Sequence, residues 1–327
     1  MKDFSRSLLE WYDKNKRDLP WRREVTPYRV WVSEIMLQQT RIEAAKDYFE
    51  RFTAALPDVR ALAEADEDTV LKLWQGLGYY SRARNLRKAA RLVCETYGGE
   101  LPADYEALRA LPGVGDYTAG AIASIAFGLK ESAVDGNVLR VVSRLERCGE
   151  SSGSGSYRRR VRAELKGLMP EGRCGDFTAA VMELGETVCV PGTPDCGRCP
   201  LAGLCGAHAA GEETRYPVMP EKKPRRVEEK NILLLTCRGK TAVYRRPEKG
   251  LLAKLWGYPE GAPPEGAERC GEAVHVFSHV EWHMTGWRRE LPEEDGRYVW
   301  VTAEEREALA IPAAYRAFSE QLSGWGY

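Results

Sequence analysis

The chain has 327 residues, of which 43% are hydrophobic, and its 48 basic residues balance its 48 acidic residues. This length is enough for two or more domains with buried cores. A net charge of zero excludes a global field that would attract a polyanion, so contact with one requires a local patch. The longest apolar run, residues 119–129, is shorter than the about 20 residues of a membrane-spanning helix, and the N-terminus has no signal-peptide pattern. We therefore expect a soluble intracellular protein that has no membrane partner.

The first 205 residues have the apolar spacing of helices. Thr26 followed by Pro27 is a helix-start signal, because a hydroxyl caps the first turn and proline suits its first position. Apolar residues then recur three and four positions apart in three segments, 31–36, 42–52 and 70–77. We predict an all-α region over residues 1–205.

The composition changes twice after this region. Residues 206–230 are rich in proline and charge, which is typical of a linker. Beyond them the sequence alternates like strands in four segments, 231–237, 240–246, 273–279 and 297–302. Two helical segments, 302–310 and 312–322, close the chain. We predict an α+β domain over residues 231–327.

Four cysteines form a compact run, with six, two and five residues between Cys189, Cys196, Cys199 and Cys205. Zinc sites usually show two C-x-x-C pairs or cysteine with histidine, whereas this run has one pair and His208 lies outside it. Four thiolates suit a cubane iron–sulfur cluster, which we favour over zinc and over disulfides. The other five cysteines are scattered, as expected for small buried apolar residues: Cys94, Cys148, Cys174, Cys237 and Cys270.

The stretch LPGVGDYTAGAI, residues 111–122, places Gly113 and Gly115 in a tight turn before a helix of small residues. Backbone N–H groups at such a helix start can hold a phosphate, although an ordinary turn between packed helices has the same composition. Basic residues in segment 82–91 favour a polyanion, or else form a solvated helix face.

Two acidic residues lie in suggestive positions. Glu34 belongs to a helix whose neighbouring residues are apolar, so it is either a surface residue or a partly buried acid of raised proton affinity. Asp135 begins the Asp-Gly-Asn sequence that by itself indicates only a turn.

Taken in order, these motifs resemble those of the helix-hairpin-helix DNA glycosylases with an iron–sulfur loop, of the endonuclease III superfamily. Within this superfamily the sequence is similar to the adenine DNA glycosylases of the MutY type. The motifs that carry the resemblance are LPWR (19–22), SEIMLQQT (33–40), GLGYYSRARNL (76–86), LPGVGDYTAGAIASIAFG (111–128), VDGNVLRV (134–141) and the cysteine run.

The resemblance implies a multidomain fold and a function. Residues 1–205 would form a six-helix hairpin-helix-hairpin subdomain and an iron–sulfur subdomain with loop 189–205, and residues 231–327 a Nudix-like domain that recognises the lesion. The expected activity is base excision repair by a monomeric, cytoplasmic or nucleoid-associated enzyme carrying a [4Fe-4S] cluster. Its partner would be double-stranded DNA with adenine opposite 8-oxoguanine or guanine.

The resemblance also assigns the reacting groups. Glu34 would protonate N7 of adenine and activate water, and Asp135 would stabilise the oxocarbenium-like sugar, a division of labour known from glycoside hydrolysis. Tyr117 would hydrogen-bond near that centre and Asn137 would help to place water or Asp135. Tyr117 occupies the position of the lysine of lyase-type relatives, and a phenol cannot form a Schiff base. We therefore expect a monofunctional glycosylase.

The target base must leave the duplex to be reached. By resemblance, Gln39 and Tyr79 would fill the gap, with Thr40 and Leu77 nearby, although Tyr79 and Leu77 are equally plausible core residues. Arg22 and Leu37 would lie near the adenine pocket. The hairpin residues Gly113 and Gly115 would contact DNA, and residues 111–116 would hold a structural monovalent or divalent cation.

The second domain lacks the metal-holding Nudix sequence, since RRELPEEDG (288–296) is a poor match, so we expect it to bind without hydrolysing. Lesion contacts are expected from Phe277, Ser278 and His279, with Ser278 foremost, unless this stretch is simply a strand end with a turn.

One departure concerns Thr178 and Ala179, where the family commonly has asparagine and then glutamine or glutamate. Without that amide or carboxylate, either Glu183, Arg22 or backbone groups read the adenine edge, or adenine selectivity is looser. Two further functions stay open: another mismatch or lyase-type glycosylase on this scaffold, and a non-catalytic lesion-binding protein.

Overall fold

The computed structural model describes residues 2–221 and 224–325. Contacts between Cα atoms divide the chain into two compact units. The first contains Met1–Ala65 and Asn85–Glu221, and the second contains Asp66–Arg84 and Lys222–Tyr327.

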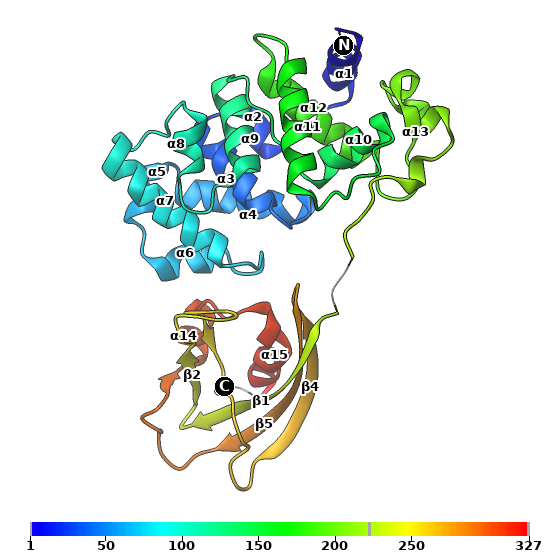
Figure 1. The fold of residues 1–327 in the computed structure, drawn as a ribbon. Coiled ribbons are helices and arrows are strands. Elements are labelled where there is room, and N and C mark those ends of the chain that lie inside the picture. Colours follow the sequence, from blue (N-terminus) through cyan, green and yellow to red (C-terminus); the bar gives the residue numbers. More distant parts are fainter. Residues whose placement is uncertain (1, 222–223, 326–327) are drawn as a thin grey trace. The chain divides into compact units, whose positions relative to one another are not determined.

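The first unit is built from helices (Figure 1). Before the second unit's segment they are α1 (Lys2–Asn15), α2 (Pro20–Arg23), α3 (Pro27–Leu37), α4 (Ile42–Ala55) and α5 (Val59–Glu64). After it they are α7 (Ser81–Tyr97, entering from the second unit), α8 (Tyr105–Arg109), α9 (Asp116–Phe127), α10 (Gly136–Glu146), α11 (Gly155–Leu168) and α12 (Cys174–Thr187). Short turns follow: η1 (Cys196–Arg198), η2 (Ala202–Leu204), α13 (Gly206–Ala209) and η3 (Glu213–Arg215). None of the helices within the described ranges is long and apolar enough to cross a membrane.

Capping and close packing position the helices that carry the site. The Thr26 hydroxyl accepts a hydrogen bond from Arg29 N at 3.2 Å, as the sequence predicts. Helix α9 packs between α3 and α12. At Gly120 of α9 a Cβ atom would lie 2.3 Å from Ser132 O, so only glycine allows the backbone to approach this closely. Buried apolar residues of α1, α10, α11 and α12 fill the neighbouring core: Leu8, Val138, Tyr157, Phe177 and Leu184.

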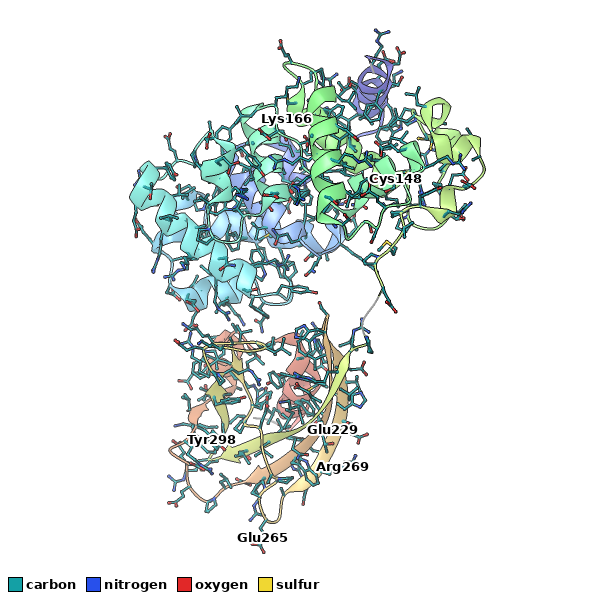
Figure 2. The ribbon with its side chains drawn as sticks, in the orientation of Figure 1. Cys148, Lys166, Glu229, Glu265, Arg269 and Tyr298 are labelled. Carbon is teal, nitrogen blue, oxygen red and sulfur yellow. The ribbon has the colours of Figure 1, made fainter. Side chains whose placement is uncertain are left out.

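The second unit contains a six-stranded sheet of order β3-β2-β1-β5-β4, with β6 paired to β2 (Figure 1). The strands are β1 (Arg226–Cys237), β2 (Lys240–Arg245), β3 (Trp256–Gly257), β4 (Glu268–Val276), β5 (Val280–Glu290) and β6 (Val299–Val301). Strands β1 and β5 run parallel and the other pairs are antiparallel. Helices α14 (Ala303–Ala308) and α15 (Arg316–Gly324), joined by η4 (Ala313–Tyr315), complete it. Tyr315 and Phe318 pack on Ile232 and Trp282, while Glu229 and Arg269 are exposed on their strands (Figure 2).

Three details differ from the sequence-based expectation for this unit. Strand β1 begins at Arg226, inside the predicted linker, because its first residues pair with β5 from Val280 onward. Strand β5 was not predicted, although Val280, Trp282 and Met284 alternate as buried residues. The predicted strand 273–279 ends at Val276.

Residues 66–84 group with the C-terminal segment because side chains link them. Gln75 Nε2 donates to Ile311 O at 2.7 Å, and Arg245 Nη2 lies 2.8 Å from Asp68 Oδ1. Helix α6 (Glu67–Leu73) lies in this segment. The domain limits at residues 205 and 231 remain predictions.

Candidate active site and metal centre

A cavity of about 730 Å³ opens between α2, α3, α9, α10 and α12 of the first unit. This volume is in the range of small-molecule sites in proteins. Eight of the residues singled out from the sequence line it: Arg22, Glu34, Leu37, Gln39, Thr40, Tyr117, Asp135 and Asn137. The fold therefore gathers residues that are up to about a hundred positions apart in the chain around one space large enough for a purine.

Glu34 lies in the C-terminal half of α3, with only 6% of its surface exposed. Within the described residues, its Oε2 atom has no hydrogen-bond partner. Burial raises the pKa of Glu34 to about 7, a hydrogen-bonding interaction with Tyr117 opposes the rise, and the charge of Asp135 adds to it. A carboxyl group with this pKa can be protonated at neutral pH and can donate that proton.

Asp135 is the N-cap of α10, which explains why an Asp-Gly-Asn turn signal appears in the sequence. Its Oδ1 accepts from Val138 N at 2.7 Å and its Oδ2 from Asn137 Nδ2 at 3.0 Å. Burial raises the pKa of Asp135, and these hydrogen bonds counteract the rise because they favour the charged form. The carboxylate is thus fixed at the cavity wall.

Tyr117 begins the second half of the first turn of α9 and also faces this centre. Burial raises the pKa of its phenol well above the usual value, and the charges of Glu34 and Asp135 add to the rise. The phenol therefore stays protonated and remains a hydrogen-bond donor; it contacts Met182 Sδ at 3.8 Å.

Glu183 forms the most strongly paired carboxylate of the cavity and has 1% of its surface exposed. Its Oε1 accepts from Arg17 Nε at 2.6 Å, and its Oε2 accepts from Arg17 Nη2 and Arg22 Nη2, each at 2.9 Å. Arg22 is thus oriented by Glu183 at the rim of the cavity, where the sequence predicts it.

Gln39 and Tyr79, the two predicted wedge residues, share an unusual backbone conformation. Their φ angles are 59° and 47°, in the left-handed region that residues other than glycine rarely adopt. Backbone strain of this kind concentrates at functional sites. Gln39 is exposed at the cavity and 45% of the Tyr79 surface is exposed, so Tyr79 is not a core residue.

The remaining predicted contacts lie outside the cavity. Leu77 is buried at 8% exposure, in agreement with the core alternative. Gly113 has a φ of 79°, and Gly115 is the N-cap of α9 without a side-chain cap, so backbone N–H groups of that helix start are left for a ligand.

The stretch 277–279 forms the turn between β4 and β5, closed by a hydrogen bond from Phe277 N to Val280 O at 2.8 Å. Phe277 packs against Trp282 with ring centroids 5.0 Å apart, which leaves Ser278 and His279 exposed. Within the second unit, the hydroxyl oxygens of Ser278 and Tyr79 are 2.5 Å apart.

All four cysteines of the run are free thiols, on a loop held by its own turns. Cys189 follows α12 and is buried, and Arg144 Nη1 donates to its Sγ at 3.3 Å. Burial, with mutual thiolate repulsion among the causes, raises the pKa of Cys196 and of Cys199 to about 11. Thiolates that repel one another here would be stabilised by a bound cationic group, so the donor set fits a metal centre.

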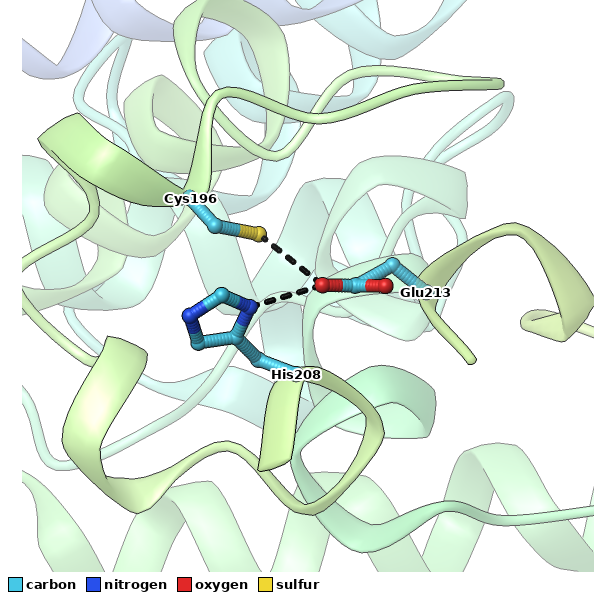
Figure 3. Close-up of side chains that lie close together, drawn as sticks. All are labelled: Cys196, His208 and Glu213. Carbon is cyan, nitrogen blue, oxygen red and sulfur yellow. Dashed lines mark hydrogen bonds and ion pairs between the residues drawn. The ribbon is translucent and has the colours of Figure 1, made fainter. Parts of the chain in front are cut away.

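Cys196 also belongs to a second group of possible ligands (Figure 3). Its Sγ lies 3.7 Å from Glu213 Oε1, which is 2.7 Å from His208 Nδ1. The three ligand atoms lie within 4.8 Å of one another. Cys196 therefore belongs to two overlapping donor sets, one with the other cysteines and one with His208 and Glu213.

Comparison with known proteins assigns the two parts of the chain. Residues 32–170 match the HhH-GPD superfamily of base excision DNA repair proteins, and residues 231–321 match the NUDIX domain. The adenine DNA glycosylase of Rattus norvegicus is 34% identical, over 98% of this chain and 79% of that protein. The enzyme of the same description from Homo sapiens is 36% identical, over 98% of this chain and 75% of that protein. The chain belongs to the adenine DNA glycosylase family.

Solved structures agree at the level of the fold. A thermostable thymine-DNA glycosylase matches with a TM-score of 0.57 and 30% identity, over 64% of this chain and 97% of that chain. A trapped endonuclease III–DNA intermediate matches with a TM-score of 0.54 and 23% identity, over 63% and 94%. The predicted fold class, a helical glycosylase region followed by a Nudix-like α+β domain, is confirmed. So is the predicted enzyme class, a DNA N-glycosylase of base excision repair.

Sequence reasoning missed three residues that shape the glycosylase site. Arg140 is buried and donates to Asn137 Oδ1 at 2.7 Å, and Arg17 holds Glu183. Glu186 lines the cavity from the end of α12. Arg140 could have been noticed, because it interrupts the apolar run of α10 between Leu139 and Val141.

Proposed function

We propose that this glycosylase hydrolyses the bond between adenine and deoxyribose where adenine lies opposite 8-oxoguanine or guanine in double-stranded DNA, and that one chain acts on one duplex. The observation that carries the proposal is a buried carboxyl group, Glu34, whose free Oε2 lines the same cavity as Asp135. Adenine DNA glycosylases at 34% and 36% identity support the choice of base.

The proposed reaction divides the work between these carboxyl groups. The protonated Glu34 gives its proton to N7 of the flipped adenine while the C1′–N9 bond breaks and its electron pair leaves with the base. The ionised Asp135 faces the sugar cation, held by Asn137 and the start of α10. The oxygen of a water molecule then bonds to C1′, and its proton passes to the Glu34 carboxylate. General acid catalysis of this type contributes about 10²–10⁴-fold.

No strand cleavage accompanies the reaction in this proposal. The cavity position next to Glu34 and Asp135 is occupied by Tyr117, which cannot form a Schiff base with the sugar. Among the described residues that line the cavity, the single lysine is Lys16, which lies near Tyr12 and not near Tyr117.

We also propose that Cys189, Cys196, Cys199 and Cys205 hold a [4Fe-4S] cluster. When bound, such a cluster would supply four iron–thiolate bonds that fix the loop after α12. The contact of Arg144 with Cys189 Sγ supports this set, because a nearby cation stabilises a thiolate. In this proposal the His208–Glu213 pair is a hydrogen-bonded neighbour of Cys196 and not a ligand set.

DNA recognition is proposed to be shared. Residues 1–205 would bind the adenine strand, with the exposed N–H groups after Gly113 and Gly115 on phosphate and Gln39 in the base stack. Residues 231–327, joined through 206–230, would recognise the opposite base through Ser278 and Tyr79. Their short contact supports a shared position at the lesion. The cation at 111–116 stays a prediction.

A gel assay tests the function. A duplex with adenine opposite 8-oxoguanine is incubated with the protein and analysed with and without alkali. Cleavage only after alkali is the expected result. Nicking without alkali would favour a lyase-type glycosylase, and binding without any release would favour a lesion-binding protein.

A further inference from the structure

The wall of the cavity formed by α12 lacks the group with which relatives are expected to read the base. Ala179 lines the cavity and presents only a methyl group. Thr178 is buried at 4% exposure, and its hydroxyl donates to Ser124 Oγ at 2.9 Å, away from the cavity residues. Neither residue can hydrogen-bond the edge of a flipped purine.

Two other carboxylates of α12 are already committed. Both oxygens of Glu183 accept hydrogen bonds from arginines, so the compensating role considered for it from the sequence is disfavoured. Asp176 accepts from Arg173 Nε at 2.8 Å, and its charge acts on Tyr12 at the far rim.

Glu186 is the carboxylate that remains. It follows Ala179 by seven residues, about two helical turns, so the two side chains occupy the same face of α12 and both line the cavity. Its Oε2 accepts from Arg17 Nη2 at 2.5 Å, which fixes the side chain. Within the described part of the chain Oε1 makes no hydrogen bond, and 30% of the side chain is exposed, so it can accept from a ligand.

Glu186 also lies on the correct side of the cavity. Its negative charge raises the pKa of both Glu34 and Tyr117, so it faces the group proposed to protonate N7. The exocyclic amine of adenine lies beside N7 on the same base edge. A side chain that reads the amine must therefore lie beside Glu34.

We infer that Glu186, oriented by Arg17, is the specificity-determining residue that accepts a hydrogen bond from the 6-amino group of the flipped purine. The inference rests on the proposed function. It also explains discrimination, because guanine and hypoxanthine carry an acceptor oxygen at this position and a carboxylate would repel it. In this chain the reading group has moved two turns along one helix face, from position 179 to position 186.

Single-turnover excision from three duplexes tests the inference. Opposite 8-oxoguanine they carry adenine, unsubstituted purine, which lacks the amine, or hypoxanthine. For Glu186→Ala the ratio of adenine to purine excision rates should fall about ten- to hundredfold, the usual size of one base-edge contact. For Glu186→Gln, hypoxanthine excision should rise relative to adenine excision, because an amide N–H can donate to O6.

Two further variants sharpen the result. Ala179→Gln in the Glu186→Ala background should restore the adenine-to-purine ratio by supplying an amide from the same helix face. Glu10→Ala, an exposed glutamate of α1, should leave the ratio as in the unmodified protein.

Other outcomes overturn the inference. If Glu186→Ala slows adenine and purine excision equally, Glu186 acts through Glu34 and does not read the amine. If the ratio stays within about twofold, Glu186 has no part in selectivity. If the unmodified protein releases none of the three bases, the proposed function itself fails, and the inference fails with it.

Discussion

The guanidinium of Arg140 connects Asn137 to the backbone of Cys189. Its Nη2 donates to Asn137 Oδ1 and its Nε donates to Cys189 O, each at 2.7 Å. Asn137 in turn donates to Asp135 at 3.0 Å. A continuous chain of hydrogen bonds therefore runs from the first cysteine of the loop to the carboxylate in the cavity, and the position of the loop affects the orientation of Asp135.

Replacing Arg140 with methionine should reduce both stability and excision. The change leaves Asn137 Oδ1, Cys189 O and Gly185 O without their donor, and each unpaired buried acceptor costs about 1–3 kcal/mol. Urea unfolding should show a loss of at least about 2 kcal/mol. Excision under saturating enzyme should slow because Asp135 loses its orientation. Arg159→Met, at an exposed position of α11, is the control, and equal effects of the two changes would refute the network.

The acidity of Glu34 predicts how excision depends on pH. With a pKa of about 7, Glu34 is protonated below that pH and loses its proton above it. Single-turnover excision should therefore fall as the pH rises through about 7. Glu34→Gln should bind DNA but release no base at any pH, and excision by this variant would remove Glu34 from the mechanism.

The same group predicts a pH-dependent change in stability. Its pKa is raised on folding from 4.5 to about 7, so the folded chain holds a proton that the unfolded chain releases between these values. The free energy of unfolding should then decrease with rising pH over this window, by about 3 kcal/mol in total. Glu34→Gln should lack this decrease, which denaturant unfolding at pH 4.5 and pH 8 would measure.

Sequence could supply the identity of the site but not its internal pairing. Ordered motifs were sufficient for Glu34, Asp135 and the cysteine run, because each motif stays contiguous in the chain. The partners of Glu183 and Asn137 come from residues that local patterns do not connect, such as Arg17, which is 166 positions away from Glu183. Glu186 was overlooked because its relation to Ala179 appears only when both face one cavity.

The fold shows the same limit. Helix starts such as Thr26-Pro27 have local chemical signals and were predicted correctly. The parallel pairing of β1 with β5 joins segments about 54 residues apart, which no local pattern specifies, and it extends β1 into the predicted linker.

The two overlapping donor sets at Cys196 make different predictions for metal content. If the four cysteines hold a [4Fe-4S] cluster, Cys199→Ser should lose bound iron and its visible absorption, whereas His208→Ala should keep both. If Cys196, His208 and Glu213 are the ligands, the result should be reversed. Cys148→Ser is a matched control outside the run, and elemental analysis of each purified variant provides the readout.

The contact between Tyr79 and Ser278 predicts how the two residues recognise the opposite base. Their hydroxyl oxygens are 2.5 Å apart, and Ser278 is exposed in a turn that Phe277 anchors against Trp282. Ser278→Ala should reduce the preference for 8-oxoguanine over guanine opposite adenine by about tenfold, the size of one hydrogen bond of 1–3 kcal/mol to a base. Excision rates from the two duplexes measure this ratio.

If the hydroxyls act as one unit, Tyr79→Phe combined with Ser278→Ala should lower the ratio by less than the product of the two single effects. The exposed Ser156→Ala of α11 serves as the control. A ratio that stays the same in both single variants would show that the turn at residues 277–279 does not read the lesion. In that case the Nudix-like domain would contribute to DNA binding without selecting the base.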